Sequence, residues 1–503
     1  MAIYPALSTV RRLARRFNRI PVYREMNLSE PGMLMLLKSL QSEEHVMFLE
    51  SACRRGRPGR FSFLGLAPRA LVRFLPPGII KVREGGTERT LEINFFDYMK
   101  ARLAGHRAPH YGRFGDFNGG YAGYMGFELV NHCGIMRAPV REEQEQPLAM
   151  FHLIDDFIVC DNRDSRYHAA TCIYADGGEP IEVLYARAAA RLEEIERETI
   201  ARIGTTRVPY LPLRADADCL SFRDAPGTFI DRVVRAKELI AAGEALQVVL
   251  SMRADITERV DPFLFYLRLR QLNPSPYMFF LKFGELIVTG SSPEIHVKVK
   301  GGRAFLKPIA GTIRQGENRT ENAHHKATLL ADPKERAEHL MLVDLARNDL
   351  ARISEPGSVK VTRFMEPEDY SHVIHLVSLV ESGVKGGTDA VDVLRETFPA
   401  GTVSGAPKVR ALEIIDELEP HARGIYAGAV GYLGFNGHAD TCITIRTAVF
   451  SPDESYLQAG AGIVYDSVPE NEYREIRHKL AALAASLPFG RRQEQEEAIA
   501  CSV

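Results

Sequence analysis

Short apolar runs, separated by Gly, Pro and charged residues, dominate the first ~210 residues of the chain. Runs of this length, flanked by such residues, predict β-strands. The clearest of them lie at 20–24, 45–51, 71–74 and 79–83. A different spacing follows at 182–203, where Leu184, Leu192 and Ile195 recur near helical intervals among charged residues. That segment is predicted to form a long helix.

The segment 204–218 (GTTRVPYLPLRADAD) is typical of a linker. It separates an N-terminal region, 1–210, from a C-terminal region, 221–490, which holds nearly every motif that could carry chemistry. Strand and helix patterns follow one another without the regular βαβ rhythm of a parallel sheet. The predicted fold class is therefore α+β.

One motif occurs once in each region. The frame GxxGYxGF spans 120–127 and returns at 428–435. Glycine within a strand-like run commonly marks a bulge or a close approach of two backbones. No GxGxxG follows a strand and opens a helix, so dinucleotide binding is not indicated. The repeat instead predicts two related halves of a packed sheet system.

The composition of the 503 residues, 45% hydrophobic and 25% charged, allows a large buried core. Lys and Arg total 63 against 65 Asp and Glu, which favours neither nucleic acid nor a membrane surface as a partner. The seven cysteines form no CxxC pair, as expected in a reducing compartment. No apolar run reaches the ~18 residues of a membrane span, and no signal-peptide pattern is recognisable. A cytoplasmic enzyme is expected.

Two glutamates lie on the apolar face of a predicted helix. Asp332 suits the N-cap and Pro333 the first helical position. Glu335 and Glu338 are three residues apart and share a face with Leu342. Carboxylates on an apolar face are costly to bury unless a cation neutralises them. Taken alone, the pattern slightly favours a simpler interpretation, in which Glu335 completes a capping box and Glu338 is solvated.

A second pair of glutamates opens the last long helix. Ser467 and Glu470 form the pattern of a capping box, and Glu472 and Glu475 are again three residues apart. Two helices that each offer such a pair from their first turns could jointly build a site of oxygen ligands. Ligands of this kind, with no His or Cys nearby in the sequence, suit Mg²⁺ better than zinc.

Two further segments could bind an anion. The AGAG run at 459–462 can present unhindered backbone N–H groups, although this short motif alone is a weak signal. Arg446 lies in a stretch that alternates apolar and polar residues like a half-buried strand. An arginine there more often pairs with a structural carboxylate, but its planar fork also suits a substrate carboxylate.

Several motifs, in order along the C-terminal region, resemble the chorismate-utilising enzymes. They are SSPE (291–294), PIAGT (308–312), ERAEHLMLVDLARND (335–349), HLVS (375–378), FPAGTVSGAPK (398–408), YAG (426–428) and AGAGIV (459–464). The N-terminal region resembles the anthranilate branch of that family through YRE (23–25), LES (49–51) and RFSFLG (60–65). The resemblance covers nearly the whole chain. It implies two large antiparallel sheets packed as a sandwich, with helices outside and the two regions intertwined.

Two positions distinguish the branches of the family. Relatives that add water at C2 of chorismate carry a lysine base where this chain has Gln247. Aminodeoxychorismate synthases tend to carry a lysine where this chain has Ala310. Because this chain lacks a lysine at both positions, the nucleophile is expected to come from outside the chain, as ammonia. The resemblance therefore implies the large subunit of an anthranilate synthase, which forms anthranilate and pyruvate in tryptophan biosynthesis.

The resemblance also implies roles for individual residues. Mg²⁺ would be held by Glu335, Glu338, Glu472 and Glu475. Catalysis would involve Glu294 as general acid for the C4 hydroxyl, His375 beside the same oxygen, and Thr402. The substrate would contact Gln247, Gly311, Thr312, Tyr426, Arg446, Gly460, Ala461 and Gly462. The loop at 311–316 departs from the usual GTRPRG, which leaves any role of Arg314 open.

No cysteine has the surroundings of a glutaminase nucleophile, so a separate glutamine amidotransferase subunit is expected to deliver ammonia within a hetero-oligomer. The resemblance also implies feedback inhibition by L-tryptophan. The inhibitor would contact Leu49, Glu50, Ser51, Asn273, Pro276, Tyr277 and Met278, with Val464 and Tyr465 as neighbours. The segment 273–279 could instead be a buried turn that leads into a strand.

Each catalytic candidate has a simpler interpretation when taken singly. His375 could be a core histidine, Glu294 a carboxylate at a helix start, and Thr402 an ordinary turn residue. For the whole chain, the alternatives are an aminodeoxychorismate synthase, whose product retains the enolpyruvyl group, and a catalytically silent tryptophan-sensing subunit. A sensor would have no need of four glutamates as magnesium ligands.

Overall fold

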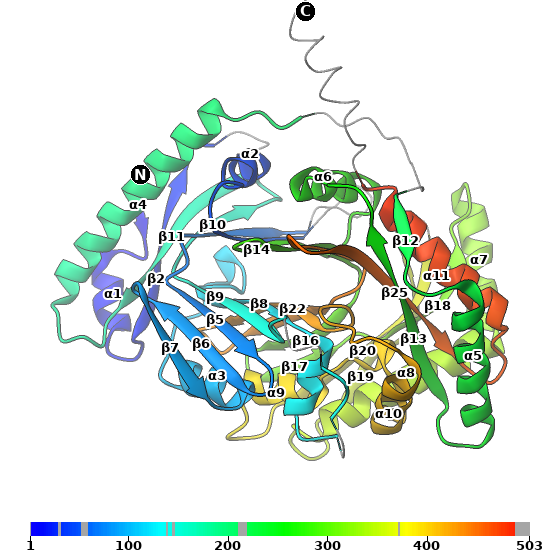
Figure 1. Ribbon diagram of the computed structural model, residues 1–503. Helices are drawn as coiled ribbons and strands as arrows, with labels where there is room; N and C mark the ends of the chain where they lie inside the picture. The colour runs from blue at the N-terminus through cyan, green and yellow to red at the C-terminus, as the bar shows by residue number, and fades with distance from the viewer. Residues whose placement is uncertain are drawn as a thin grey trace, which may run out of the picture.

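Two large antiparallel β-sheets pack against each other, and helices cover the outside of the pair (Figure 1). The computed structural model describes residues 2–28, 32–51, 59–136, 139–142, 146–209, 219–370 and 373–487. Most of the predicted linker, at 210–218, lies outside these ranges. The α+β class and the two-sheet architecture are confirmed. In the described ranges, no helix has both the length and the apolar character needed to span a membrane.

The first sheet has 13 strands. Its spatial order is β1 (Ile3–Tyr4), β2 (Arg19–Met26), β11 (Arg166–Tyr174), β10 (Asp156–Asp161), β4 (Phe61–Leu66), β3 (His45–Glu50), β14 (Tyr277–Phe283), β15 (Leu286–Ser292), β24 (Thr447–Phe450), β25 (Ser455–Ile463), β13 (Gln247–Ile256) and β12 (Leu220–Phe222). The short strand β21 (Gly405–Ala406) also pairs with β13. Because β3 pairs with β14, both regions of the chain contribute to this sheet.

The second sheet has 12 strands. Its order is β18 (Ile309–Arg314), β20 (Val373–Gly383), β17 (Arg303–Leu306), β16 (Ile295–Lys300), β23 (Ala439–Ile443), β22 (Ala429–Gly434), β8 (Gly120–Met125), β9 (Ala149–Ile154), β5 (Ala70–Leu75), β6 (Ile79–Glu84) and β7 (Thr87–Glu92). The strand β19 (Lys360–Asp369) pairs with β20. The pairing of β8 with β22 again joins the two regions.

The helices surround these sheets. The α-helices are α1 (Leu7–Leu13), α2 (Gly32–Ser39), α3 (Phe95–Ala104), α4 (Ile181–Thr205), α5 (Pro226–Ala241), α6 (Pro262–Leu272), α7 (Arg319–Ala331), α8 (Pro333–Ala351), α9 (Ala390–Thr397), α10 (Lys408–Leu418) and α11 (Pro469–Ala484). Short 3₁₀ turns are η1 (Gly112–Phe114), η2 (Phe127–His132) and η3 (Gly401–Val403). The long helix predicted at 182–203 is α4, and the four predicted strands are β2, β3, β5 and β6.

A core rich in aromatic side chains lies between the facing sheets. Phe63, Phe157 and Phe279 come from the 13-stranded sheet, and Tyr124 and Tyr432 come from the other. Each is at most 8% exposed. Burying a side chain of this size stabilises the fold by roughly 1.5–3 kcal/mol, so this layer holds the two sheets in fixed relative positions.

The repeated GxxGYxGF motif lies where the two regions of the chain meet. Its copies form β8 and β22, which pair antiparallel with Gly123 opposite Gly431. A Cβ atom at either glycine would overlap a carbonyl oxygen of the next strand, that of Met150 or Asp440. The close backbone approach predicted from the glycines is confirmed.

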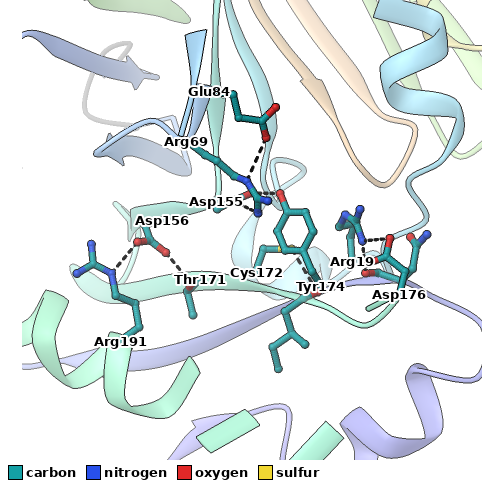
Figure 2. A network of polar contacts seen from close by, with 12 residues as sticks. Arg19, Arg69, Glu84, Asp155, Asp156, Thr171, Cys172, Tyr174, Asp176 and Arg191 are labelled. Carbon is teal, nitrogen blue, oxygen red and sulfur yellow. Dashed lines mark hydrogen bonds and ion pairs between the residues drawn. The ribbon is translucent and has the colours of Figure 1, made fainter. Parts of the chain in front are cut away.

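A polar network closes the corner where the chain passes from one sheet to the other (Figure 2). Asp155 lies between β9 and β10 and accepts hydrogen bonds from the hydroxyl of Tyr174 at 2.6 Å and from Arg69 at 3.4 Å. The guanidinium groups of Arg19 and Arg69 lie 3.9 and 4.3 Å from the centre of the Tyr174 ring. Burial raises the pKa of Asp155 to about 6. These contacts fasten the N-terminal parts of the two sheets together.

Candidate active site

The helix α8 begins as the sequence predicts and directs a carboxylate toward β18. The side chain of Asp332 caps it, accepting hydrogen bonds from the N–H groups of Lys334 at 2.9 Å and Glu335 at 3.2 Å. The carboxylate of Glu335 accepts a hydrogen bond from the backbone N–H of Thr312 at 3.0 Å. Its bond to the strand β18 distinguishes it from a carboxylate that only completes a capping box.

His375 lies beside Thr312 on the paired strands β18 and β20. Its Nδ1 atom is 2.9 Å from the Thr312 hydroxyl and 3.3 Å from the carbonyl oxygen of Gly311. The ring of Tyr370 packs edge-on against the imidazole, with centroids 4.8 Å apart. Gly311 has a φ of +78°, and a Cβ there would lie 3.4 Å from the Glu335 carboxylate. The predicted residues of this strand pair therefore form one cluster with Glu335.

Sequence reasoning missed His339, which fastens α8 to the same strands. Its Nδ1 atom is 3.3 Å from the carbonyl oxygen of Ala310, and its Nε2 atom is 2.6 Å from the hydroxyl of Ser378. Burial lowers the pKa of this imidazole. In the neutral ring Nδ1–H donates to the carbonyl and Nε2 accepts from Ser378. The signal available in the sequence was its position four residues after Glu335, on the same helix face.

The helix α11 begins at Pro469, but the predicted capping box is wrong. Its N-cap is Val468, and no side chain caps it. The hydroxyl of Ser467 instead accepts a hydrogen bond from the N–H of Val464 at 3.1 Å, within the turn that leaves β25. Glu470 is therefore an exposed residue of the first turn. Burial raises the pKa of Glu472, although a hydrogen bond from Ser467 acts in the opposite direction.

The four predicted magnesium ligands lie close enough to affect one another. Burial, and after it the negative charges of Glu335, Glu475 and Glu472, raise the pKa of Glu338. The first turns of α8 and α11 thus present a group of carboxylates that repel one another. A divalent cation with oxygen ligands would relieve this repulsion, so the donor set fits Mg²⁺.

A different group in the described chain has its potential ligand atoms closer together. His110, Asp116 and His438 bring one atom each within 4.8 Å of one another. Asp116 is already paired with Lys298 at 3.0 Å and Lys300 at 2.8 Å. Its charge is therefore balanced by two protein cations.

Lys479 was also missed by sequence reasoning. Its amino group donates to the carbonyl oxygen of Gly460 at 2.8 Å and pairs with Glu475 at 2.6 Å. It follows Glu475 by four residues on α11, so the helical spacing carried a signal. Its positive charge also reaches Glu294. Lys479 thus links the carboxylate group to the glycine run of β25.

Glu294 is a half-buried residue between β15 and β16. A strand follows it, so the interpretation as a helix-start carboxylate is wrong. Burial raises its pKa to about 7, although Thr402 and the charge of Lys479 act in the opposite direction. Glu294 and Thr402, which lies in the turn η3, both border a small cavity of about 40 Å³. A carboxyl group that is protonated near neutral pH can serve as a general acid.

Arg446 does not lie in a strand, as the alternating pattern suggested. It occupies the link between β23 of one sheet and β24 of the other, with a φ of +51°. Its carbonyl oxygen accepts a hydrogen bond from the N–H of Ser291 at 3.1 Å. Burial lowers the pKa of its guanidinium. Among the residues that the structure describes, no carboxylate forms an ion pair with it, which is the state expected of a group that binds an anionic ligand.

The remaining predicted substrate residues are brought together on β13 and β25. A Cβ atom at Gly460 would lie 2.6 Å from the hydroxyl oxygen of Tyr426, and one at Gly462 would overlap the amide of Gln247. Ala461 is buried between the two glycines. Tyr426 and Gln247 therefore lie directly against the glycine run.

The two predicted inhibitor segments are neighbours in the first sheet. Glu50 pairs with Met278 and Leu49 with Phe279 on the adjacent strands β3 and β14. The guanidinium of Arg270 binds both oxygens of Glu50 at 2.8–3.0 Å, and Tyr266 donates to the same carboxylate at 2.5 Å.

The other predicted inhibitor residues extend from these strands. Asn273 follows α6, Pro276 precedes β14, Tyr277 begins that strand, and Ser51 follows β3. Val464 and Tyr465 lie elsewhere, between β25 and α11, because β15 and β24 separate β25 from β14. The structure therefore does not bring this last pair to the inhibitor segments.

Most of the chain matches a known family of proteins. Residues 74–485 match the family described as chorismate binding enzyme, and the chain belongs to that family. Anthranilate synthase component 1 of Aquifex aeolicus is 40% identical over 98% of this chain and 99% of its own length. That of Acetivibrio thermocellus is 38% identical over 96% of this chain and 98% of its own length.

Solved structures agree with this assignment. Anthranilate synthase component I from Streptococcus pneumoniae is 34% identical, with a TM-score of 0.73, over 85% of this chain and 92% of its own. The menaquinone-specific isochorismate synthase of Escherichia coli has a TM-score of 0.67 over 96% of this chain and 98% of its own, at 20% identity. At this low identity, the similarity to the isochorismate synthase shows a shared fold only.

Proposed function

We propose that this protein is the chorismate-converting component of an anthranilate synthase. It aminates chorismate with ammonia and releases pyruvate to give anthranilate. The observation that carries the proposal is Glu294, a half-buried residue that borders a cavity together with Thr402 and whose carboxyl pKa is raised to about 7. Such a group can give a proton to the departing C4 hydroxyl near neutral pH. The full-length relatives named above support the same reaction.

The group of carboxylates supports a requirement for Mg²⁺. Glu335 and Glu338 from α8, with Glu472 and Glu475 from α11, would hold the ion. When bound, it supplies positive charge that neutralises and orients a substrate carboxylate. Arg446 would bind the second carboxylate of the substrate through its two-pronged guanidinium. Tyr426 and the N–H groups near Gly460 and Gly462 would complete the binding of that group.

The reaction balances without a redox partner. The nitrogen of ammonia forms a bond to C2, the ring double bonds shift, and the C4–O bond breaks. Glu294 donates the proton that lets this oxygen leave as water, and His375 stands beside Thr312 to orient the same hydroxyl. Loss of the C2 proton and cleavage of the C3–O bond then release enolpyruvate, which takes up a proton at its methylene carbon to become pyruvate. The second step makes the ring aromatic.

The choice of ammonia rests on two side chains. Gln247 lies against Gly462, where relatives that add water carry a lysine, and its neutral amide is not a base strong enough to activate water. Ala310 offers no amino group from β18 for attack on C2. These residues favour a small nucleophile from outside the chain. A glutamine amidotransferase subunit would provide it in a cytoplasmic hetero-oligomer, and L-tryptophan would inhibit the enzyme through the segments around Glu50 and Tyr277.

A continuous assay tests the proposal. The purified chain is incubated with chorismate, Mg²⁺ and an ammonium salt, and anthranilate fluorescence and pyruvate are recorded together. Equal amounts of the two products, lost with EDTA and restored by Mg²⁺, are expected. Glutamine should replace ammonium only when the amidotransferase subunit is added. Consumption of chorismate without pyruvate would contradict the proposal.

A further inference from the structure

Arg423 is a fully buried cation whose hydrogen bonds all lie within the protein. It is 2% exposed. Its Nε and Nη2 atoms donate to the two oxygens of Glu419 at 2.8 and 2.7 Å. Its remaining contacts are with backbone carbonyls, from Nη1 to Val403 at 2.7 Å and from Nη2 to Val249 at 2.6 Å. Because the guanidinium is planar and all three of its nitrogens donate hydrogen bonds, Glu419 and the two carbonyl groups are held in a fixed geometry.

The segments joined by this guanidinium carry the candidate site. Val403 directly follows Thr402 in η3. Val249 pairs with Gly462, the residue that lies against Gln247. The carbonyl of Arg423 itself accepts the N–H of Tyr426 at 3.3 Å. The side chain of Arg423 thus joins the Val403 and Val249 segments, and its main chain joins the segment of Tyr426.

The position of Arg423 is itself fixed by contacts with neighbouring residues. Glu128 in η2 accepts hydrogen bonds from the N–H groups of Arg423 at 2.6 Å and Gly424 at 3.0 Å. The ring of Phe127 lies 4.6 Å from the guanidinium carbon. Glu419 also accepts from the N–H and the hydroxyl of Ser251 on β13, at 2.7 and 3.0 Å. The end of the first GxxGYxGF copy therefore supports the loop that leads into the second.

We propose that Arg423 is a positioning residue for the chorismate site, which sets the distances among Thr402, Tyr426 and the Gly460–Gly462 run without touching substrate. The proposal rests on the proposed function for the identity of the substrate. Its structural basis is the convergence of the three site-bearing segments on one buried residue, two through its guanidinium and one through its backbone carbonyl. Displacement of these segments by even about 1 Å would lower kcat/KM by about 100-fold, because reacting and binding groups must be aligned together.

Two substitutions test the role of this fork. Arg423→Lys keeps the charge but cannot bind Glu419 and both carbonyls at once. Arg423→Gln removes the charge as well. Arg268→Gln is the matched control, because Arg268 is 1% exposed and donates at 2.6 Å to the carbonyl of Leu487, outside the candidate site. Each variant is measured by thermal unfolding, by calorimetric binding of chorismate with Mg²⁺, and by steady-state kinetics.

The expected result is a separation of stability from substrate binding. Arg423→Lys should remain folded, bind chorismate about 10-fold more weakly or worse, and lose about 100-fold in kcat/KM. Arg268→Gln should lose thermal stability and keep the wild-type affinity and KM. Unchanged affinity and KM in folded Arg423→Lys would overturn the proposal. A loss of chorismate affinity no larger in Arg423→Lys than in Arg268→Gln would overturn it as well. If the wild-type protein binds chorismate but makes no anthranilate, the proposed function fails. The chorismate affinities of wild type and Arg423→Lys still decide the role of Arg423 in that case.

Discussion

The backbone N–H of Thr312 donates a hydrogen bond to the carboxylate of Glu335 over 3.0 Å. This bond joins β18, which carries the candidate ring-binding residues, to the first turn of α8, which carries two of the candidate magnesium ligands. His339 makes a second connection between the same elements through Ala310. The strand and the helix are therefore fixed to each other before any ligand binds. A substrate carboxylate held at the metal would have its ring presented to Thr312 and His375.

Replacement of Glu338 should weaken magnesium binding. Glu338→Gln removes one charge from a group in which Glu335, Glu475 and Glu472 raise its pKa. The Mg²⁺ concentration for half-maximal activity should rise by at least the ~10- to 100-fold typical of altered metal surroundings. Glu470→Gln, an exposed position in the first turn of α11, is the control. An unchanged magnesium requirement in Glu338→Gln would show that the ion, if used, binds elsewhere.

Glu294→Gln should lose most of its turnover while chorismate still binds. A general acid contributes roughly 100- to 10,000-fold to the rate, so a fall of that size in kcat is expected. In wild type, kcat/KM corrected for the concentration of free ammonia should fall as pH rises through about 7, because Glu294 must be protonated to act. This fall should be absent from the residual activity of the variant. The rate–pH profiles of the two proteins provide the check.

The same substitution should affect stability with a definite sign. The pKa of Glu294 rises from 4.5 to about 7 on folding. The stabilising effect of its bound proton is complete below pH 4.5 and is lost as pH rises through 7, to a total of about 3 kcal/mol. Glu294→Gln should therefore raise the melting temperature more at pH 8 than at pH 5. An equal change at both values would mean that the carboxyl is ionised in the folded protein.

Arg446→Gln should impair binding without destabilising the fold. Its guanidinium is largely buried, and the described residues give it no carboxylate partner, so its removal relieves a desolvation cost. The KM for chorismate should rise by about 30-fold or more, as expected for loss of ~2 kcal/mol from a buried charge pair. Arg253→Gln is the control, because that buried arginine on β13 is paired with Glu454 and Asp255. It should lose stability and keep its KM.

Ser51→Phe should abolish inhibition by L-tryptophan and leave turnover intact. Ser51 directly follows Glu50, whose carboxylate Arg270 and Tyr266 hold in place. It packs so closely on Gly59 that a Cβ there would overlap its hydroxyl, which leaves no room for a phenyl ring. Inhibition curves for wild type, Ser51→Phe and the smaller change Ser51→Ala make the comparison. Retained inhibition in Ser51→Phe would remove this segment from the inhibitor site.

Local patterns in the sequence were sufficient for the parts of the site that depend on one helix. The spacing of Glu335 and Glu338, and the cap at Asp332, follow from helical geometry alone. The cap at Ser467 was wrong because its hydroxyl binds the N–H of Val464 in a turn whose shape no spacing rule reveals. Arg446 was placed in a strand because the pattern gives no sign that the chain changes sheets at that residue.

Tertiary arrangement explains the remaining differences. Val464 and Tyr465 were grouped with the inhibitor segments, but the order of strands in a sheet depends on long-range pairing that one sequence does not display. Arg423 had no local signal, because its partners Val249 and Val403 are contributed through backbone carbonyls. The resemblance to a family supplied the overall architecture, whereas the network around Arg423 depends on tertiary contacts that have no pattern in the sequence.

The product formed from chorismate and isotope-labelled ammonium tests the central claim most directly. Mass spectrometry of a reaction with purified protein and Mg²⁺ would identify both the ring product and the fate of the enolpyruvyl group. If the protein aminates chorismate and releases pyruvate, as proposed, the products are labelled anthranilate and an equal amount of pyruvate. Labelled aminodeoxychorismate that retains its enolpyruvyl group, or unlabelled isochorismate formed by addition of water, would contradict this proposal.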